Sequence, residues 1–188
     1  MAVAELPGTI VPSPSFRRQV EEMSGEKISA CYQCEKCTNG CPLAFSMDIV
    51  PHKLMRCTHF ELRDQILGSD TIWICASCET CTTRCPNGID IAHVMDSLRQ
   101  IAMREGVKAS QPQIPVFHRT FLASMRRFGR LHEGEMAAMY TLKTGGLRGL
   151  VAMAGMGLDM FKKGRIKILP GRPNRQVRNI FRAVERKG

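Results

Sequence analysis

Aromatic residues, acidic residues and long hydrophobic runs are all scarce in this sequence. Phe, Trp and Tyr make up 6% of 188 residues, so the 12 methionines supply much of the packing that rings usually provide. No run approaches the roughly 18 apolar residues of a membrane span, since the best candidate, 149–158, is bounded by Arg148 and Asp159. The N-terminus also lacks the basic and apolar segments of an export signal. We therefore expect a cytoplasmic protein without a transmembrane segment.

The sequence also lacks the motifs of the common enzyme classes. We find no nucleophile paired with a base, no Gly-rich phosphate loop and no dinucleotide fingerprint. The pairs Gly145-Gly146 and Gly155/Gly157 are more typical of helix ends or of close helix packing. The chain therefore has no visible machinery for substrate chemistry of its own.

Basic residues outnumber acidic ones by 27 to 17, which gives a formal net charge of +10. A basic tail is one signal of nucleic-acid binding. Here the charges alternate with apolar residues and no nucleic-acid motif accompanies them. We therefore expect either a solvated basic face or a surface for an acidic partner protein, and no nucleic acid. The basic residues of the C-terminal half include Arg126, Arg127, Arg130, Lys162, Lys163, Arg165, Lys167, Arg172, Arg175, Arg178, Arg182, Arg186 and Lys187.

The hydrophobic pattern predicts a mostly α fold. A short helix is expected at 15–24, ended by Gly25, and Asp90 is a good N-cap for a helix that Gly106 ends. The one β-like run is 71–74. We predict an N-terminal arm and short helix (1–25), a helical two-cluster ferredoxin-like core (26–106) and a helical C-terminal extension (107–188). Three apolar stripes support the extension: Phe117, Phe121, Met125 and Phe128; Leu147, Val151, Ala154, Leu158 and Phe161; and, after Asn174 as a cap, Val177, Ile180, Phe181 and Val184.

Eight of the nine cysteines form an internal repeat. The first run is Cys31, Cys34, Cys37, Cys41 and Pro42, and the second, shifted by 44 residues, is Cys75, Cys78, Cys81, Cys85 and Pro86. Glu35 and Thr38 match Glu79 and Thr82 in the same register. An Asp-Ile pair and a predicted helix follow each run. Two similar halves related by a pseudo-twofold axis are therefore expected.

Each run reads C-x2-C-x2-C-x3-C-P, which is the ligand pattern of bacterial ferredoxins that bind [4Fe–4S] clusters. Three closely spaced cysteines on a tight loop direct three sulfurs at one cluster, and the fourth faces away from it. We therefore expect two [4Fe–4S] clusters. By analogy with two-cluster ferredoxins, the fourth cysteine of each run ligates the other cluster. One cluster would take Cys31, Cys34, Cys37 and Cys85, and the other Cys75, Cys78, Cys81 and Cys41.

The remaining candidates have simpler interpretations. Structural zinc sites favour two separated C-x2-C pairs, and a disulfide framework is unusual in the reducing cytosol. Cys57 has no partner cysteine nearby and is expected to be a buried free thiol. His52 and His93 are expected in capping or surface roles. Trp73 is expected to shield the second cluster from water.

Several segments resemble the helical, two-cluster ferredoxin-like component of heterodisulfide reductase. They are the paired cysteine runs, the segments 72–81 and 84–91, and the tail 160–165 followed by Leu169-Pro170. The resemblance implies a non-catalytic electron-transfer subunit of a larger cytoplasmic complex. It would relay electrons between a flavin-containing subunit and an iron–sulfur subunit that reduces a disulfide. The Met-rich region 136–161 would dock partners.

Two other functions stay open on the sequence. The first is the iron–sulfur subunit of a membrane quinone oxidoreductase, similar to succinate or glycerol-3-phosphate dehydrogenase. The succinate type would also carry a C-x4-C-x2-C run, which is absent here. The second is a cluster-bearing protein that binds nucleic acid through its basic tail.

Overall fold

Helices are the only regular secondary structure among the described residues. The computed structural model describes residues 13, 15–164 and 175–186. Helices make up 69% of the structure, and no strand occurs among the described residues. The mostly α fold class is therefore confirmed. The predicted cap at Asn174 and most of the N-terminal arm lie outside the described residues.

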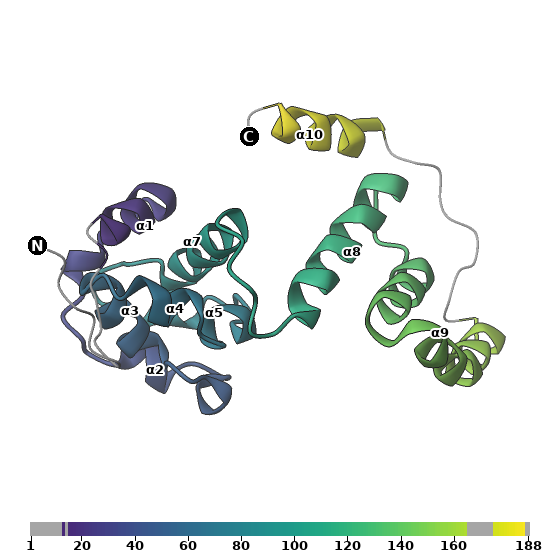
Figure 1. The fold of residues 1–188 in the computed structure, drawn as a ribbon, viewed down its shortest axis with the longest axis horizontal. Coiled ribbons are helices and arrows are strands. Elements are labelled where there is room, and N and C mark those ends of the chain that lie inside the picture. Colours follow the sequence, from purple (N-terminus) through teal and green to yellow (C-terminus); the bar gives the residue numbers. More distant parts are fainter. Residues whose placement is uncertain (1–12, 14, 165–174, 187–188) are drawn as a thin grey trace, which may run out of the picture. The chain divides into compact units, whose positions relative to one another are not determined.

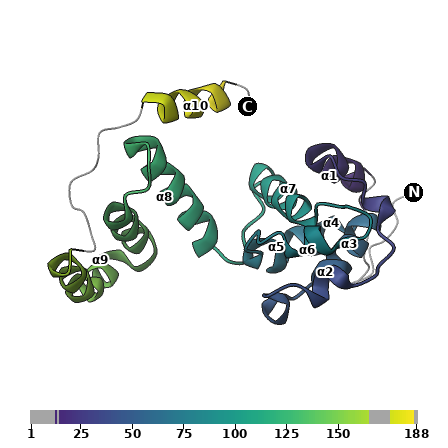
Figure 2. The same cartoon turned by 180° about the vertical axis from the view of Figure 1, so that it is seen from behind.

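Two compact units divide the chain, Met1–Gln111 and Pro112–Gly188. The first contains both cysteine runs, and the second contains most of the basic residues. Figures 1 and 2 show the helices of each unit from opposite sides. The three-part division at residues 25 and 106 stays a prediction.

The N-terminal unit consists of short helices packed around one longer helix. Its α-helices are α1 (Phe16–Ser24), α2 (Lys36–Asn39), α3 (Pro51–His59), α4 (Arg63–Leu67), α5 (Thr71–Ile74), α6 (Thr80–Arg84) and α7 (Ile91–Arg104), with 3-10 turns η1 (Ile28–Ala30) and η2 (Ala44–Ser46). Helix α7 packs against α1, α4, α5 and α6. The fully buried side chains are aliphatic for the most part and include Leu54, Met55, Ile66, Ile72, Val94 and Leu98. Burial of this apolar surface is the main stabilising contribution to the unit.

Two predicted helix ends, at Gly25 and at Asp90, are confirmed. Helix α1 ends at Gly25, which has the left-handed conformation of a C-cap. Asp90 caps α7, because its carboxylate accepts a hydrogen bond from the backbone N–H of His93. Pro51 occupies the first turn of α3. Each Asp-Ile pair is followed by a helix, as the repeat predicted.

The strand-like interpretation of 71–74 is wrong, because these residues form the helix α5. Thr71, Ile72 and Trp73 are buried in it, so the β-branched and aromatic side chains contribute to a helical core. The segment has no neighbouring strand in the described part of the chain with which it would pair.

Among its described residues, the C-terminal unit contains three helices and little buried surface. They are α8 (Gln113–Phe128), α9 (Glu133–Lys162) and α10 (Arg175–Glu185), and α8 packs against both of the others. Gly146 has non-helical backbone angles and divides α9 at a kink. In the second half of α9 the predicted stripe is exposed, with Leu147 and Val151 each 73% exposed. Within the described ranges, no helix combines the length and the apolarity needed to cross a membrane.

Candidate iron–sulfur site

The two cysteine runs share one unusual backbone conformation. Among the described residues, six that are not glycine have a positive φ, and four of these flank the second cysteine of a run. Gln33 and Glu35 surround Cys34, with φ of 62° each, and the corresponding residues Ser77 and Glu79 have φ of 50° and 59°. L-residues adopt this left-handed region at an energetic cost. The repeat in the sequence is therefore a repeat of a tightly wound loop.

A short helix begins just before the third cysteine of each run and holds the two loops together. Helices α2 and α6 pack against each other and carry Cys37 and Cys81. Desolvation raises the pKa of the Cys37 thiol, and it raises the pKa of Cys81 to about 11. At neutral pH these thiols stay protonated unless a positively charged group such as a metal centre stabilises the thiolate.

Four cysteines from both runs surround one cavity. Cys41 of the first run lines it together with Cys75, Cys78 and Cys81 of the second. The other lining residues are Pro42, Leu43, Met47, Pro51, Ala76, Ala92 and Met95, all of them apolar. These are the four cysteines that the sequence assigned to a single cluster. Thiol donors in an apolar cavity suit an iron–sulfur cluster, whose ligands are thiolates.

A hydrogen bond and electrostatic effects on neighbouring groups relate the other four cysteines to the first run. After desolvation, the charge of Cys31 also contributes to the raised pKa of Cys37. Gln33 donates a hydrogen bond from Nε2 to Cys31 Sγ at 3.2 Å. Partial desolvation, followed by the charges of Cys34 and Cys85, raises the pKa of Tyr32. Cys85 of the second run thus acts electrostatically on Tyr32 of the first run. In the described part of the chain, no three Cys, His, Asp or Glu side chains group tightly enough to hold a single metal ion.

Asp48 connects the first run to the start of the second. Its carboxylate accepts hydrogen bonds from the N–H groups of Asp70 and Thr71, each at 3.0 Å, and from the Thr71 hydroxyl at 2.7 Å. These groups form the N-terminus of α5, which leads directly into Cys75. Desolvation would raise the pKa of Asp48, but the hydrogen bonds outweigh it and hold the pKa below its usual value. Asp48 therefore fixes where the second run begins.

The matching threonines of the repeat have matching roles. Thr38 Oγ1 accepts from the backbone N–H of His52 at 3.0 Å and lies 2.8 Å from His52 Nδ1. Thr82 donates from Oγ1 to the Asp90 carboxylate at 2.9 Å and is 3.5 Å from the N–H of Ala92. Each threonine thus joins the short helix of a run to the helix that follows the run.

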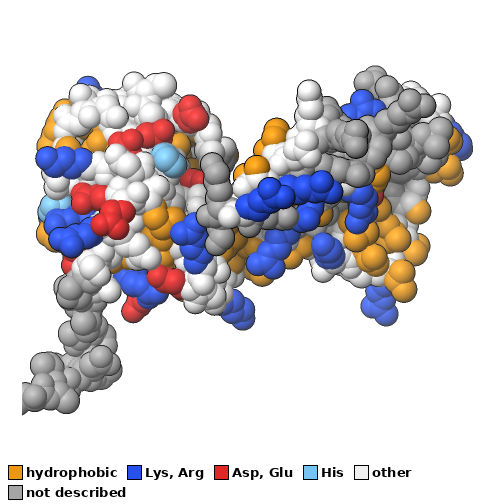
Figure 3. Space-filling view, turned by 90° about the horizontal axis from the view of Figure 1, so that it is seen from above, with side chains coloured by type: hydrophobic (Ala, Val, Ile, Leu, Met, Phe, Trp, Pro, Cys, Tyr) orange, Lys and Arg blue, Asp and Glu red, His pale blue; other side chains and the backbone are white. Residues whose placement is uncertain are grey.

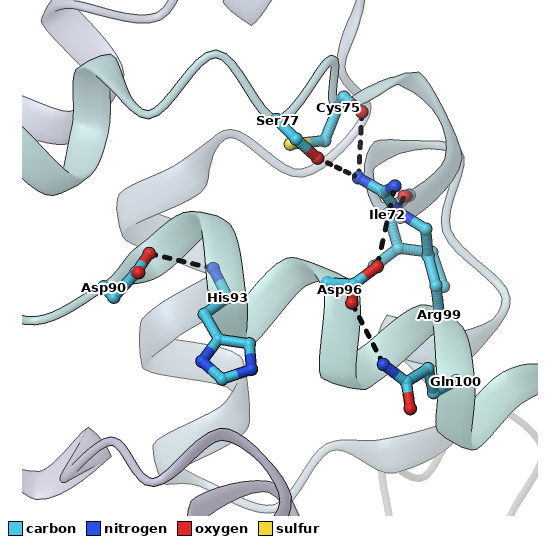
Figure 4. A network of polar contacts seen from close by, with 8 residues as sticks. All are labelled: Ile72, Cys75, Ser77, Asp90, His93, Asp96, Arg99 and Gln100. Atoms are coloured by element: carbon cyan, nitrogen blue, oxygen red, sulfur yellow. Dashed lines mark hydrogen bonds and ion pairs between the residues drawn. The ribbon is translucent and has the colours of Figure 1, made fainter. Parts of the chain in front are cut away.

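Arg99 on α7 is a site residue that the sequence reasoning missed. Its side chain is buried and donates hydrogen bonds to the carbonyl oxygens of Ile72 and Cys75 at 2.6 and 2.9 Å (Figure 4). It also donates to Ser77 Oγ at 3.2 Å. The signal available in the sequence was an arginine on the apolar face of a predicted helix, between Leu98 and Ile101.

The remaining predicted residues lie apart from the cavity. Cys57 is half-buried on α3, does not line the cavity, and has its pKa raised by desolvation. His93 is exposed, as expected, whereas His52 is part-buried and contacts Thr38. Trp73 is 3% exposed and its Nε1 has no hydrogen-bond partner among the described residues. Its shielding of a cluster stays a prediction.

Comparison with known proteins identifies this part of the chain. No curated protein matches the sequence. Residues 27–89, about a third of the chain, match the family model described as a 4Fe-4S dicluster domain. All eight cysteines of the two runs fall within this range. Residues 27–89 are therefore a 4Fe-4S dicluster domain, consistent with an iron–sulfur protein that has an electron-transfer role.

Proposed function

We propose that this chain transfers electrons through two [4Fe–4S] clusters whose ligands cross between the two runs. One cluster is held by Cys31, Cys34, Cys37 and Cys85, and the other by Cys41, Cys75, Cys78 and Cys81. The observation that supports this best is the apolar cavity at which Cys41 meets three cysteines of the second run. Crossed ligands keep two clusters close together. A bound cluster supplies one-electron redox chemistry, and the chain positions the sulfurs and excludes water.

Iron content tests this proposal. The reconstituted chain is expected to bind about eight irons, four for each cluster, and the reduced protein should give the EPR spectrum of two interacting spins. Cys57→Ala is the control, because Cys57 does not line the cavity, and it should leave both iron content and spectrum unchanged. About four irons per chain, or zinc in place of iron, would contradict the proposal. Loss of a cluster from a folded Cys57→Ala variant would make Cys57 a ligand.

The complex in which the chain acts resembles heterodisulfide reductase. Its partners are a flavin-containing subunit and an iron–sulfur subunit that reduces a disulfide, in the cytoplasm. Support comes from α9, whose second half exposes Leu147, Val151, Met156 and Leu158, each more than half exposed. Apolar side chains gathered on an exposed helix mark an interaction surface.

A groove along α9 suits such a partner. Its lining residues are Glu133, Gly134, Ala137, Ala138, Leu150, Met153, Ala154, Met156, Gly157 and Met160. Flexible methionines adapt to the shape of a partner, and the small residues let a helix approach closely. On the face shown in Figure 3, Lys and Arg predominate over Asp and Glu in the C-terminal unit. Such a surface steers an acidic partner protein towards the groove.

A pair of matched variants tests the docking role. Ala154 lines the groove, whereas Ala152 is equally exposed on the same helix and does not line it. Ala154→Trp should fill the groove and abolish co-purification of the partner subunits, while cluster content stays unchanged. Ala152→Trp should retain the partners. If both variants co-purify their partners equally well, the docking surface lies elsewhere.

A further inference from the structure

Arg99 places a fixed positive charge inside the N-terminal unit. The residue is 7% exposed, and no other Asp, Glu, Lys or Arg in the described part of the chain is buried. A guanidinium stays protonated under all conditions in which a protein is folded. Burial of a charge is costly, so this charge has to be held by hydrogen bonds.

Those hydrogen bonds direct the charge at the second cysteine run. Nε donates to the carbonyl oxygen of Ile72, and Nη2 donates to the carbonyl oxygen of Cys75 and to Ser77 Oγ. Figure 4 shows the guanidinium between α7 and the loop that carries Cys75 and Ser77. The charge is therefore fixed against the loop that supplies three of the four cysteines at the cavity.

The first run has no corresponding buried charge among the described residues, since Arg84, whose guanidinium lies beside Gly40 of this run, is exposed. Helix α3 packs against η1, which leads into Cys31, much as α7 packs against α5, which leads into Cys75. The buried residues of α3 are Pro51, Leu54, Met55 and Thr58, all uncharged. Its cations Lys53 and Arg56 are exposed, where water and salt screen them. The repeat is therefore symmetric in its cysteines and asymmetric in its buried charge.

We infer that Arg99 makes the two clusters unequal, by raising the reduction potential of the cluster at the second run above that of the cluster at the first. The inference depends on the proposed two-cluster function. Gain of one electron makes a cluster more negative, and a nearby buried cation stabilises that form more than the oxidised form. The first electron to enter the protein then reduces the cluster at the second run.

Asp96 opposes this effect in part. Its carboxylate lies 4.0 Å from Arg99 Nη1 and accepts a hydrogen bond from Gln100 Nε2 at 3.0 Å. The Asp96 side chain is 49% exposed, so solvent weakens its influence. Removal of this carboxylate should therefore shift the same cluster in the opposite direction from removal of Arg99, and by less.

The test is an EPR-monitored redox titration of the full chain after iron analysis has established two clusters. Cys34→Ser and Cys78→Ser identify the signals, because these cysteines are exposed and equivalent in the repeat. In the wild type, the signal that Cys78→Ser alters should be reduced first. Arg99→Met should lower the potential of that cluster by an amount equal to about a tenfold change in the one-electron equilibrium, or about 59 mV. Arg99→Lys should restore most of the shift.

Two further variants distinguish an effect of the Arg99 charge on the potential from an effect of disturbed folding. Arg104→Met removes an exposed cation from the same helix and should move neither potential. Asp96→Asn leaves Arg99 in place and should raise the potential of the second-run cluster. The inference is overturned if Cys78→Ser alters the signal that is reduced last, or if Asp96→Asn and Arg99→Met shift the potential in the same direction. Iron analysis that finds fewer than two clusters would instead contradict the proposed function.

Discussion

At the scale of single residues, Asp48 is a side chain that joins the segment after the first run to the N-terminus of α5. Its carboxylate accepts hydrogen bonds from three backbone N–H groups, of Ile49, Asp70 and Thr71, and from one hydroxyl, of Thr71. These bonds satisfy donors at the N-terminus of α5 that would otherwise lack a partner. Because they are made to the charged form, they depress the pKa of the carboxyl.

Asp48→Asn should therefore destabilise the protein at neutral pH by about 1 kcal/mol, the usual cost of a lost helix cap. A depressed pKa contributes stability that is fully present above the pKa of the unfolded chain, near 3.8. This contribution is lost as the pH falls through the lower pKa of the folded state. The difference between variant and wild type should thus be constant from about pH 6 to 8 and shrink below about pH 4.

Anaerobic urea unfolding at several pH values measures this difference. The matched control is Asp64→Asn, because the Asp64 side chain is 93% exposed and bonds only to its neighbour Arg63 among the described residues. The control should unfold like the wild type. An Asp48→Asn difference that grows as the pH falls would contradict the role assigned to Asp48.

Residues whose role depends on local spacing were predicted, and residues whose role depends on distant contacts were not. The eight cysteines follow from a fixed spacing, and the capping role of Asp90 follows from its place before an apolar run. Asp48 contacts residues 22 and 23 positions later, and Arg99 contacts residues 24 and 27 positions earlier. Such contacts exist only once the helices have packed, so no local pattern contains them.

At the scale of elements, the kink in α9 depends on one glycine. Gly146 has φ 59° and ψ −159°, a combination that is essentially limited to glycine. Gly145, its neighbour, is not among the residues with positive φ. An added Cβ at either position would meet nothing within 4 Å, so substitution there affects the backbone alone.

Substitution by alanine should therefore change the stability of the C-terminal unit in opposite directions at the two glycines. Gly146→Ala should destabilise the C-terminal unit by about 1–3 kcal/mol, the cost of a strained backbone. Gly145→Ala should stabilise it by up to about 1 kcal/mol, because alanine is the better helix former. Thermal unfolding followed by far-UV circular dichroism compares them. Equal stability of the two variants would show that the kink does not require Gly146.

Helix α5 shows why a short element is hard to predict. Residues 71–74 have the composition of a strand, and four residues are too few for a helical period to be detected. The structure makes them helical because Asp48 supplies the cap and because Ile72 and Trp73 are buried. Tertiary contacts thus override local propensity.

At the scale of the whole molecule, the two units differ in how much of their apolar surface they bury. The N-terminal unit buries its aliphatic side chains around α7. Among the described residues of the C-terminal unit, Pro115, Thr120, Ser124 and Met136 are buried, whereas Leu147, Val151, Ile180 and Val184 are exposed. The three apolar stripes predicted α8, α9 and α10 correctly as helical. Whether an apolar stripe is buried against another part of this chain depends on tertiary packing. The periodicity of the sequence does not encode that packing.

The central claim is that the fourth cysteine of each run is a ligand of the cluster held by the first three cysteines of the other run. EPR spectra of four reduced variants, Cys34→Ser, Cys78→Ser, Cys41→Ser and Cys85→Ser, test it most directly. Cys34→Ser and Cys78→Ser each mark the cluster of their own run. Crossed ligation predicts that Cys41→Ser alters the same signal as Cys78→Ser, and that Cys85→Ser alters the same signal as Cys34→Ser. If Cys41→Ser instead alters the signal that Cys34→Ser alters, each run holds its own cluster and the claim is wrong.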